Sequence, residues 1–124
     1  MTDWRRIRAR LREFALGLPE AYEEHPWGES VIKVDRKVFV FLGVPEPTAR
    51  RRPGFTVKLR ESREHVRHAV PGAVPAGYGL GRYGWVHVPL TGEPPDEELL
   101  CDWIEESYRV IAPKRLVARL DAAR

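Results

Sequence analysis

Three consecutive arginines, Arg50, Arg51 and Arg52, form the densest positive cluster of the chain. They lie in residues 43–54, a stretch rich in proline and glycine that predicts a loop. Guanidinium groups are planar donors that bind phosphate oxygens in pairs, so such a cluster could neutralise several phosphates of a nucleic acid. A solubilising loop would carry the same charges, because nothing in this stretch is a base-reading signature. Both interpretations stay open.

A second combination of residue types occurs further along the chain, where Arg82 and Tyr83 follow one another. A guanidinium beside an aromatic ring can contact a phosphate and stack on a base. Together with the cations near the arginine cluster, these residues form the predicted nucleic-acid contacts: Arg50, Arg51, Arg52, Lys58, Arg60, Arg82 and Tyr83.

The segment 79–84 matches the letters G-x-G-x-x-G of a dinucleotide-binding motif. That motif needs a following helix to receive the pyrophosphate, whereas residues 85–88 predict a strand. We therefore exclude dinucleotide binding here and assign the glycines to tight turns.

Other side chains that could bind metal or catalyse have simpler interpretations. His65 and His68 lack a third ligand at a suitable spacing, and Cys101 on an apolar helix is typical of a small buried hydrophobe. Four carboxylates share one face of the same helix, which we interpret as a solvated face: Glu98, Asp102, Glu105 and Glu106. We expect no metal, no cofactor and no catalytic residues.

The elements that carry these residues follow from hydrophobic periodicity. The pattern predicts an α+β fold in a single compact domain over residues 1–124, with an N-terminal helix, a mainly antiparallel sheet and helices at the C-terminus. Arg5, Arg8 and Arg12 lie off the apolar stripe of the first helix, so we expect them to be solvated. The predicted elements are a helix from Trp4 to Gly17, strands over 30–34, 37–42, 55–59 and 85–89, a short helix over 62–69, a helix from Asp96 and a short helix or turn over 116–120.

Length and charge narrow the class of protein. The 124 residues suffice for one domain, and no run is apolar enough for a membrane span or a signal sequence, so we expect a soluble cytoplasmic protein without a membrane partner. The net charge of +3 is the remainder of opposed blocks, since residues 33–60 carry +6 and residues 93–106 carry −7. These blocks predict a polarised surface.

Several short motifs resemble the MmcQ/YjbR family: residues 55–59 (FTVKL), 74–78 (VPAGY), 85–88 (WVHV), and Glu106-Ser107-Tyr108 in the last long helix. The resemblance extends over roughly residues 4–120 and implies a CyaY-like fold, also likened to the double-wing fold of a phage transcription factor. The family is commonly described as DNA-binding by fold analogy. The chain departs from the family at residues 79 and 81, where glycines replace a polar run. The first helix is rich in arginine, so the iron-binding acidic ridge of frataxin-type proteins is not carried over.

These observations lead to one expected function and one alternative. We expect a small non-catalytic protein that binds DNA mainly through phosphate contacts. The alternative is a protein-interaction module whose polarised surface docks a partner protein or a second copy of the chain.

Overall fold

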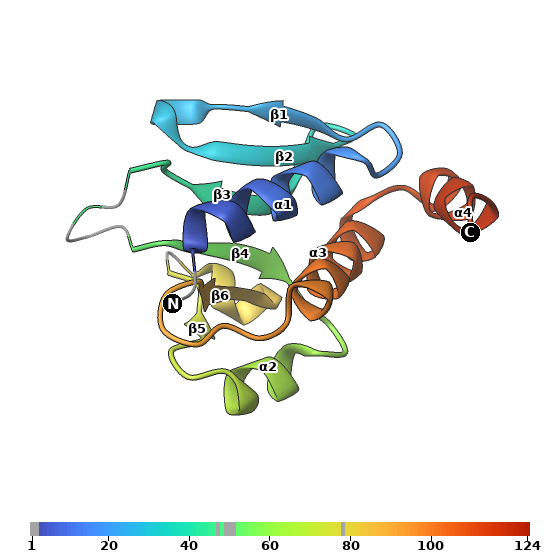
Figure 1. Ribbon diagram of the computed structural model, residues 1–124. Coiled ribbons are helices and arrows are strands. Elements are labelled where there is room, and N and C mark those ends of the chain that lie inside the picture. Colours follow the sequence, from blue (N-terminus) through green and yellow to red (C-terminus); the bar gives the residue numbers. More distant parts are fainter. Residues whose placement is uncertain (1–2, 47, 49–51, 78) are drawn as a thin grey trace.

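A six-stranded sheet forms the centre of the computed structural model, which describes residues 3–46, 48, 52–77 and 79–124 (Figure 1). The strand order is β1-β2-β3-β4-β6-β5, and each pair of neighbours is antiparallel. The strands are β1 (Tyr22–Glu24), β2 (Ser30–Val34), β3 (Lys37–Gly43), β4 (Gly54–Lys58), β5 (Val74–Pro75) and β6 (Trp85–Pro89).

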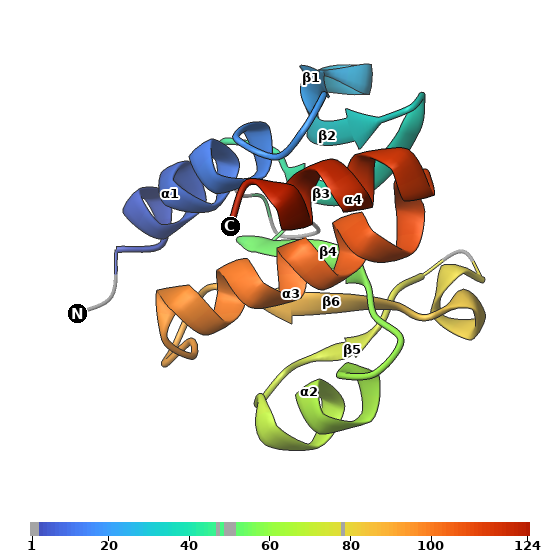
Figure 2. The same cartoon turned by 90° about the vertical axis from the view of Figure 1, so that its right-hand side faces the viewer.

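Two helices, α1 (Trp4–Leu16) and α3 (Glu97–Ile111), lie side by side on one face of this sheet (Figures 1 and 2). α1 contacts β2 and β3, and α3 contacts β3 and β4. The helix α2 (Arg63–Ala69) lies near the β5 edge, and α4 (Lys114–Ala122) follows α3 after Pro113. Within the described part of the chain, no helix combines the length and the apolar character needed to cross a membrane.

The core lies between the sheet and these two helices. Ile7 and Leu11 of α1 and Ile104 of α3 are at most 3% exposed, as expected for apolar residues at helical spacing. Tyr108 of α3 packs edge-on against Phe39 of β3, with ring centroids 5.2 Å apart. This confirms the predicted α+β domain with an N-terminal helix, an antiparallel sheet and C-terminal helices.

The structure adds two short edge strands to the predicted sheet. β1 has three residues and β5 has two, too few for a recognisable alternation of apolar and polar side chains. The turn between β2 and β3 lies at the predicted place, with both Asp35 and Arg36 in the left-handed region at φ 50° and 67°. Of the short helix or turn predicted over 116–120, the structure has the helix, and it is longer, with nine residues in α4.

The prediction that the arginines of α1 are solvated is wrong for Arg8, and Arg12 is partly exposed to solvent but also paired. The half-buried side chain of Arg8 donates to the carbonyl oxygens of Leu42 and Gly43, each at 3.1 Å. Arg12 donates from Nε and Nη2 to the carboxylate of Glu23 in β1. These contacts join α1 to the sheet, and they escaped sequence reasoning because each acceptor lies at least eleven residues away.

Candidate functional site

A cavity of about 340 Å³ opens where β4 ends and β6 begins. We call it the basic pocket, and its lining residues are Lys58, Leu59, Arg60, Arg63, Arg82, Tyr83, Gly84 and Val110. Four of the eight lining residues are positively charged, and no carboxylate lines the cavity. The pocket therefore suits an anion.

The pairing of β4 with β6 brings the two sides of this pocket together. Lys58 lies opposite Trp85 in the antiparallel register, and the Leu59 N–H donates to the Gly84 carbonyl at 2.9 Å. Gly84 has φ +96°, and a Cβ there would lie 2.7 Å from the Leu59 carbonyl oxygen. Only glycine permits this approach, so the glycine of the G-x-G-x-x-G segment shapes the pocket wall.

Glu106 of α3 holds the segment that follows β4. Its carboxylate accepts hydrogen bonds from the backbone N–H groups of Arg60 and Ser62, at 3.0 and 3.1 Å, and from the Ser62 hydroxyl at 2.6 Å. Because the bond to Arg60 uses only the backbone, the guanidinium stays available at the pocket.

The neighbouring Ser107 fixes the end of β4 itself. β3 and β4 pair at Val40 with Val57, and the next pair in that register would be Phe39 with Lys58. Instead, the buried Ser107 hydroxyl accepts the Lys58 N–H at 2.9 Å and donates to the Phe39 carbonyl. The strands thus separate around one hydroxyl, and the backbone of Lys58 is held while its side chain reaches the pocket.

Three of the four pocket cations differ from most other described cations in having no carboxylate partner, and the fourth, Arg63, forms only a long ion pair with Glu64. Among the described residues, the side chains of Lys58, Arg60 and Arg82 form no hydrogen bond or ion pair. The Nε of Arg63 is buried and donates no hydrogen bond, and the nearest carboxylate oxygen, on Glu64, is 3.8 Å away. By contrast, a carboxylate or a backbone carbonyl binds each of Arg5, Arg6, Arg8, Arg10, Arg12, Lys33, Arg67, Arg109, Arg115, Arg119 and Arg124.

Tyr83 adds an aromatic surface to the pocket. It ends the 3₁₀ turn η2 (Leu80–Tyr83), directly before Gly84 and β6, and its side chain is 63% exposed. The strand β6 follows η2, as predicted, so the glycine segment lacks the following helix that a dinucleotide-binding motif needs.

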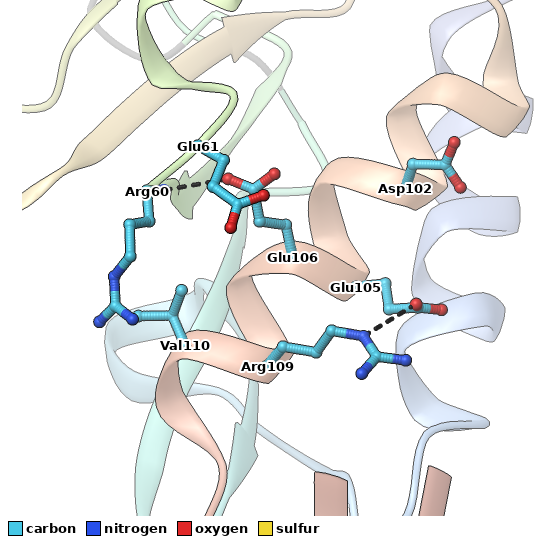
Figure 3. Close-up of a pocket in the computed structure, with 7 residues that line it drawn as sticks. All are labelled: Arg60, Glu61, Asp102, Glu105, Glu106, Arg109 and Val110. Carbon is cyan, nitrogen blue, oxygen red and sulfur yellow. Dashed lines mark hydrogen bonds and ion pairs between the residues drawn. The ribbon is translucent and has the colours of Figure 1, made fainter. Parts of the chain in front are cut away.

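A second cavity, of about 280 Å³, adjoins the basic pocket and shares Arg60 and Val110 with it (Figure 3). Its other lining residues are Glu61, Asp102, Glu105, Glu106 and Arg109. Figure 3 shows the Arg60 side chain extending beside Val110, while Glu105 binds Arg109 one turn further along α3 at 3.1 Å. Negative side chains thus lie beside the basic pocket and not on an opposite face.

The carboxylates of α3 are only partly the solvated face that we expected. Glu106 binds the segment after β4, and Glu105 binds Arg109 and Arg124, so these two are committed within the molecule. Glu98 and Asp102 are exposed as predicted. Among the described residues, no group of three or more His, Cys, Asp or Glu side chains could hold a metal ion. Cys101 is buried, and burial raises the pKa of its thiol.

The predicted nucleic-acid contacts divide into two groups. The structure brings together Lys58, Arg60, Arg82 and Tyr83 in the basic pocket. Arg52 is exposed at the other end of β4, about 20 Å of extended chain from Lys58. Arg50 and Arg51 lie outside the described residues.

Sequence reasoning missed Arg63, which lies in the first turn of α2. The only signal for it was the short spacing from Arg60, because the predicted start of a helix directly after a strand keeps both residues at one end of the sheet.

Trp27 is a further residue that sequence reasoning did not select. It lies in the 3₁₀ turn η1 (Pro26–Gly28) with φ 50°, and its side chain is 94% exposed. A large apolar side chain in a left-handed conformation is unusual on a protein surface.

Comparisons with known proteins found a matching family and similar solved structures. The model of the YjbR family matches residues 16–110. A crystal structure of a Deinococcus radiodurans protein with a DUF419 domain is similar at TM-score 0.70 and 26% identity, over 91% of this chain and 86% of that one. A Pseudomonas syringae protein is similar in fold at TM-score 0.62 and 22% identity, over 83% of this chain and 97% of that one. No curated protein matches the chain.

Proposed function

The chain belongs to the YjbR family, and from its basic pocket we propose that it is a non-catalytic nucleic-acid-binding protein that holds phosphates there. One observation carries the proposal: Lys58, Arg60 and Arg82 line one cavity, and their charged side chains have no partner among the described residues. Cations without an internal counter-ion keep their full attraction for phosphate, and their binding releases condensed counterions from the nucleic acid. We also propose a double-wing type of fold and a cytoplasmic location, which are both expectations from the sequence alone.

The local structure supports this assignment because backbone groups make the structural hydrogen bonds and leave the charged side chains for the ligand. The backbone N–H groups of Lys58 and Arg60 donate to Ser107 and Glu106, so the ammonium and guanidinium groups of these residues make no structural contact. Arg63 lines the same cavity and adds a fourth positive charge to it, although its Nε lies 3.8 Å from a carboxylate oxygen of Glu64. Charge-assisted bonds from such donors to phosphate are about twice as strong as bonds between neutral groups.

We expect the triple variant Lys58→Ala/Arg60→Ala/Arg82→Ala to bind nucleic acid far more weakly while keeping its fold. For single-stranded DNA, the slope of log affinity against log salt should fall by about 0.7 for each cation removed. Fluorescence anisotropy at about 50 mM and about 200 mM salt measures this slope.

Arg52→Ala is the matched control, because Arg52 is exposed, lacks a partner among the described residues and lies at the other end of β4. Its affinity should stay within about twofold of the wild type, as for a cation outside the contact. A loss as large as that of the triple variant would place the site elsewhere, and no binding by the wild type at low salt would refute the proposal.

A second candidate function rests on Trp27. A tryptophan with 94% of its side chain exposed is typical of an anchor that inserts into a partner protein or a second copy of the chain. If this function holds, Trp27→Ala should abolish an association detected by sedimentation velocity or co-purification and leave nucleic-acid affinity unchanged. Wild-type protein that sediments as a monomer and retains no partner would exclude it.

A further inference from the structure

We propose that the basic pocket takes an unpaired nucleotide of single-stranded nucleic acid, with its phosphate against the cations and its base stacked on Tyr83. This inference rests on the proposed function and names the form of nucleic acid that the pocket selects. It is carried by the shape of the pocket, the exposure of one ring and the position of the neighbouring carboxylates.

The shape of the site favours a single nucleotide. A cavity of about 340 Å³ lies at the lower end of the range for small-molecule sites, roughly 300–1,000 Å³. Its cations come from three short segments, the end of β4, the start of α2 and the turn η2, and they surround a hollow. A duplex presents its phosphates along a convex surface, which such a hollow cannot enclose, whereas a single strand can direct one phosphate into it.

Tyr83 supplies a partner for an unpaired base. Its side chain is 63% exposed and belongs to the lining of the same pocket as Arg82. The backbone of Tyr83 lies in the turn before β6, where the Gly84 N–H donates to the Gly81 carbonyl at 3.1 Å. Bases within a duplex are already stacked on one another, so only an unpaired base offers its face to this ring.

The neighbouring cavity sets a boundary on one side of the pocket. Glu61 and Asp102 line it, and the two cavities meet at Arg60. A duplex carries two rows of phosphates, about one negative charge per 1.7 Å of axis, and a duplex laid over Arg60 would bring some of them against these carboxylates. A flexible single strand can approach from the side of Arg82 and avoid them.

The test compares three DNA probes of one sequence and about 12 nucleotides: a single strand, its duplex and a single strand of abasic sites. Each is titrated against wild type, Tyr83→Ala and Tyr83→Phe in the full-length chain. We expect the wild type to prefer the single strand over the duplex, and Tyr83→Ala to lose about 5- to 100-fold in affinity for it, the range for one stacked base. Tyr83→Phe keeps the ring and should bind like the wild type, and abasic DNA should bind all three proteins alike.

The outcomes separate this inference from the proposed function. Equal binding of single strand and duplex, with no effect of Tyr83→Ala, would overturn the inference and leave phosphate binding at the pocket intact. A duplex preference would also overturn it. If no probe binds, both fail together, and if Tyr83→Ala and Tyr83→Phe lose equally, the hydroxyl and not the ring is responsible and the stacking inference is wrong.

Discussion

Three consecutive residues of α3 bind distant segments of the chain, and the first two of them position the basic pocket. Glu106 holds the segment after β4, Ser107 joins the ends of β3 and β4, and the Tyr108 hydroxyl donates to the Pro19 carbonyl at 2.8 Å. Each side chain binds a segment that is distant in sequence. The Glu106-Ser107-Tyr108 motif, which contributed to the family resemblance, thus positions other segments. None of its three residues lines the basic pocket.

Replacing Ser107 tests this positioning role. Ser107→Ala leaves the Lys58 N–H and the Phe39 carbonyl without their partner in a buried site, so we expect the free energy of unfolding to fall by about 3 kcal/mol. Ser62→Ala is the control, since its half-buried hydroxyl binds Glu106 on the same helix and should cost about 1 kcal/mol. Urea unfolding measures both, and equal losses would contradict the bridging role of Ser107.

The carboxylate of Glu23 makes stability depend on acidity. Hydrogen bonds from Arg12, and then from Ser30, lower the pKa of Glu23 from 4.5 to about 2. Because the pKa of Glu23 is lower in the folded protein, its ionised carboxylate stabilises the fold, and this contribution is complete above the pKa of the unfolded chain. The free energy of unfolding should therefore fall by roughly 2 kcal/mol as the pH drops from 4.5 towards 2.

The comparison of Glu23→Gln with Glu24→Gln isolates this contribution. Glu24 makes only an exposed pair with Lys33, so its replacement should change stability by less than about 1 kcal/mol. Glu23→Gln should lower the stability at neutral pH and flatten its decline in acid, as measured by urea unfolding across this pH range. An unchanged acid profile in Glu23→Gln would show that other groups cause the decline.

Among the elements, the β2–β3 turn lies where the sequence predicted it, and its two residues have a strained backbone conformation. Asp35 and Arg36 both adopt positive φ, a conformation that costs a non-glycine residue about 1 kcal/mol or more. Arg36→Gly should therefore raise the free energy of unfolding by about 0.5–1 kcal/mol, because the two-residue hairpin turn prefers Asp-Gly. In Gly92→Ala, at φ +78° with open space around the Cβ position, stability should fall by a similar amount. Thermal unfolding of both variants checks the two signs, and destabilisation by Arg36→Gly would contradict the strain.

The elements that could be predicted are those with a clear period. The stripes of α1 and α3 and the runs of β2 and β3 are long enough for periodicity to place them close to their observed bounds. β1 and β5 were missed because three and two residues carry no period, and each becomes a strand only by pairing with a neighbour. Arg8 could not be assigned because its acceptors, the carbonyls of Leu42 and Gly43, lie in another element.

At the scale of the molecule, the charged blocks largely pair with one another. Arg6 and Arg10 of α1 bind Glu97 of the acidic block, and Arg115 and Arg119 of α4 bind Glu20. These pairs neutralise part of the opposed charge within the molecule. The positive block at residues 33–60 is the exception, since Lys33 alone among its described cations has a carboxylate partner.

The sequence predicted only part of the candidate site. Residue type alone selected Lys58, Arg60, Arg82 and Tyr83, and the pairing of β4 with β6 brings them together. Residue type also selected Arg52, which a straight strand separates from them. Which cations remain unpaired depends on contacts between distant segments, and no local pattern contains that information.

One measurement tests the central claim, that the basic pocket binds nucleic acid, most directly. A heteronuclear NMR titration of the chain with single-stranded DNA should shift the backbone amide signals of residues 58–63 and 81–84 and leave those of Trp27, Gly28 and Arg52 unchanged. Shifts confined to the Trp27 turn or to the Arg52 end of β4, or no shifts at low salt, would contradict the account.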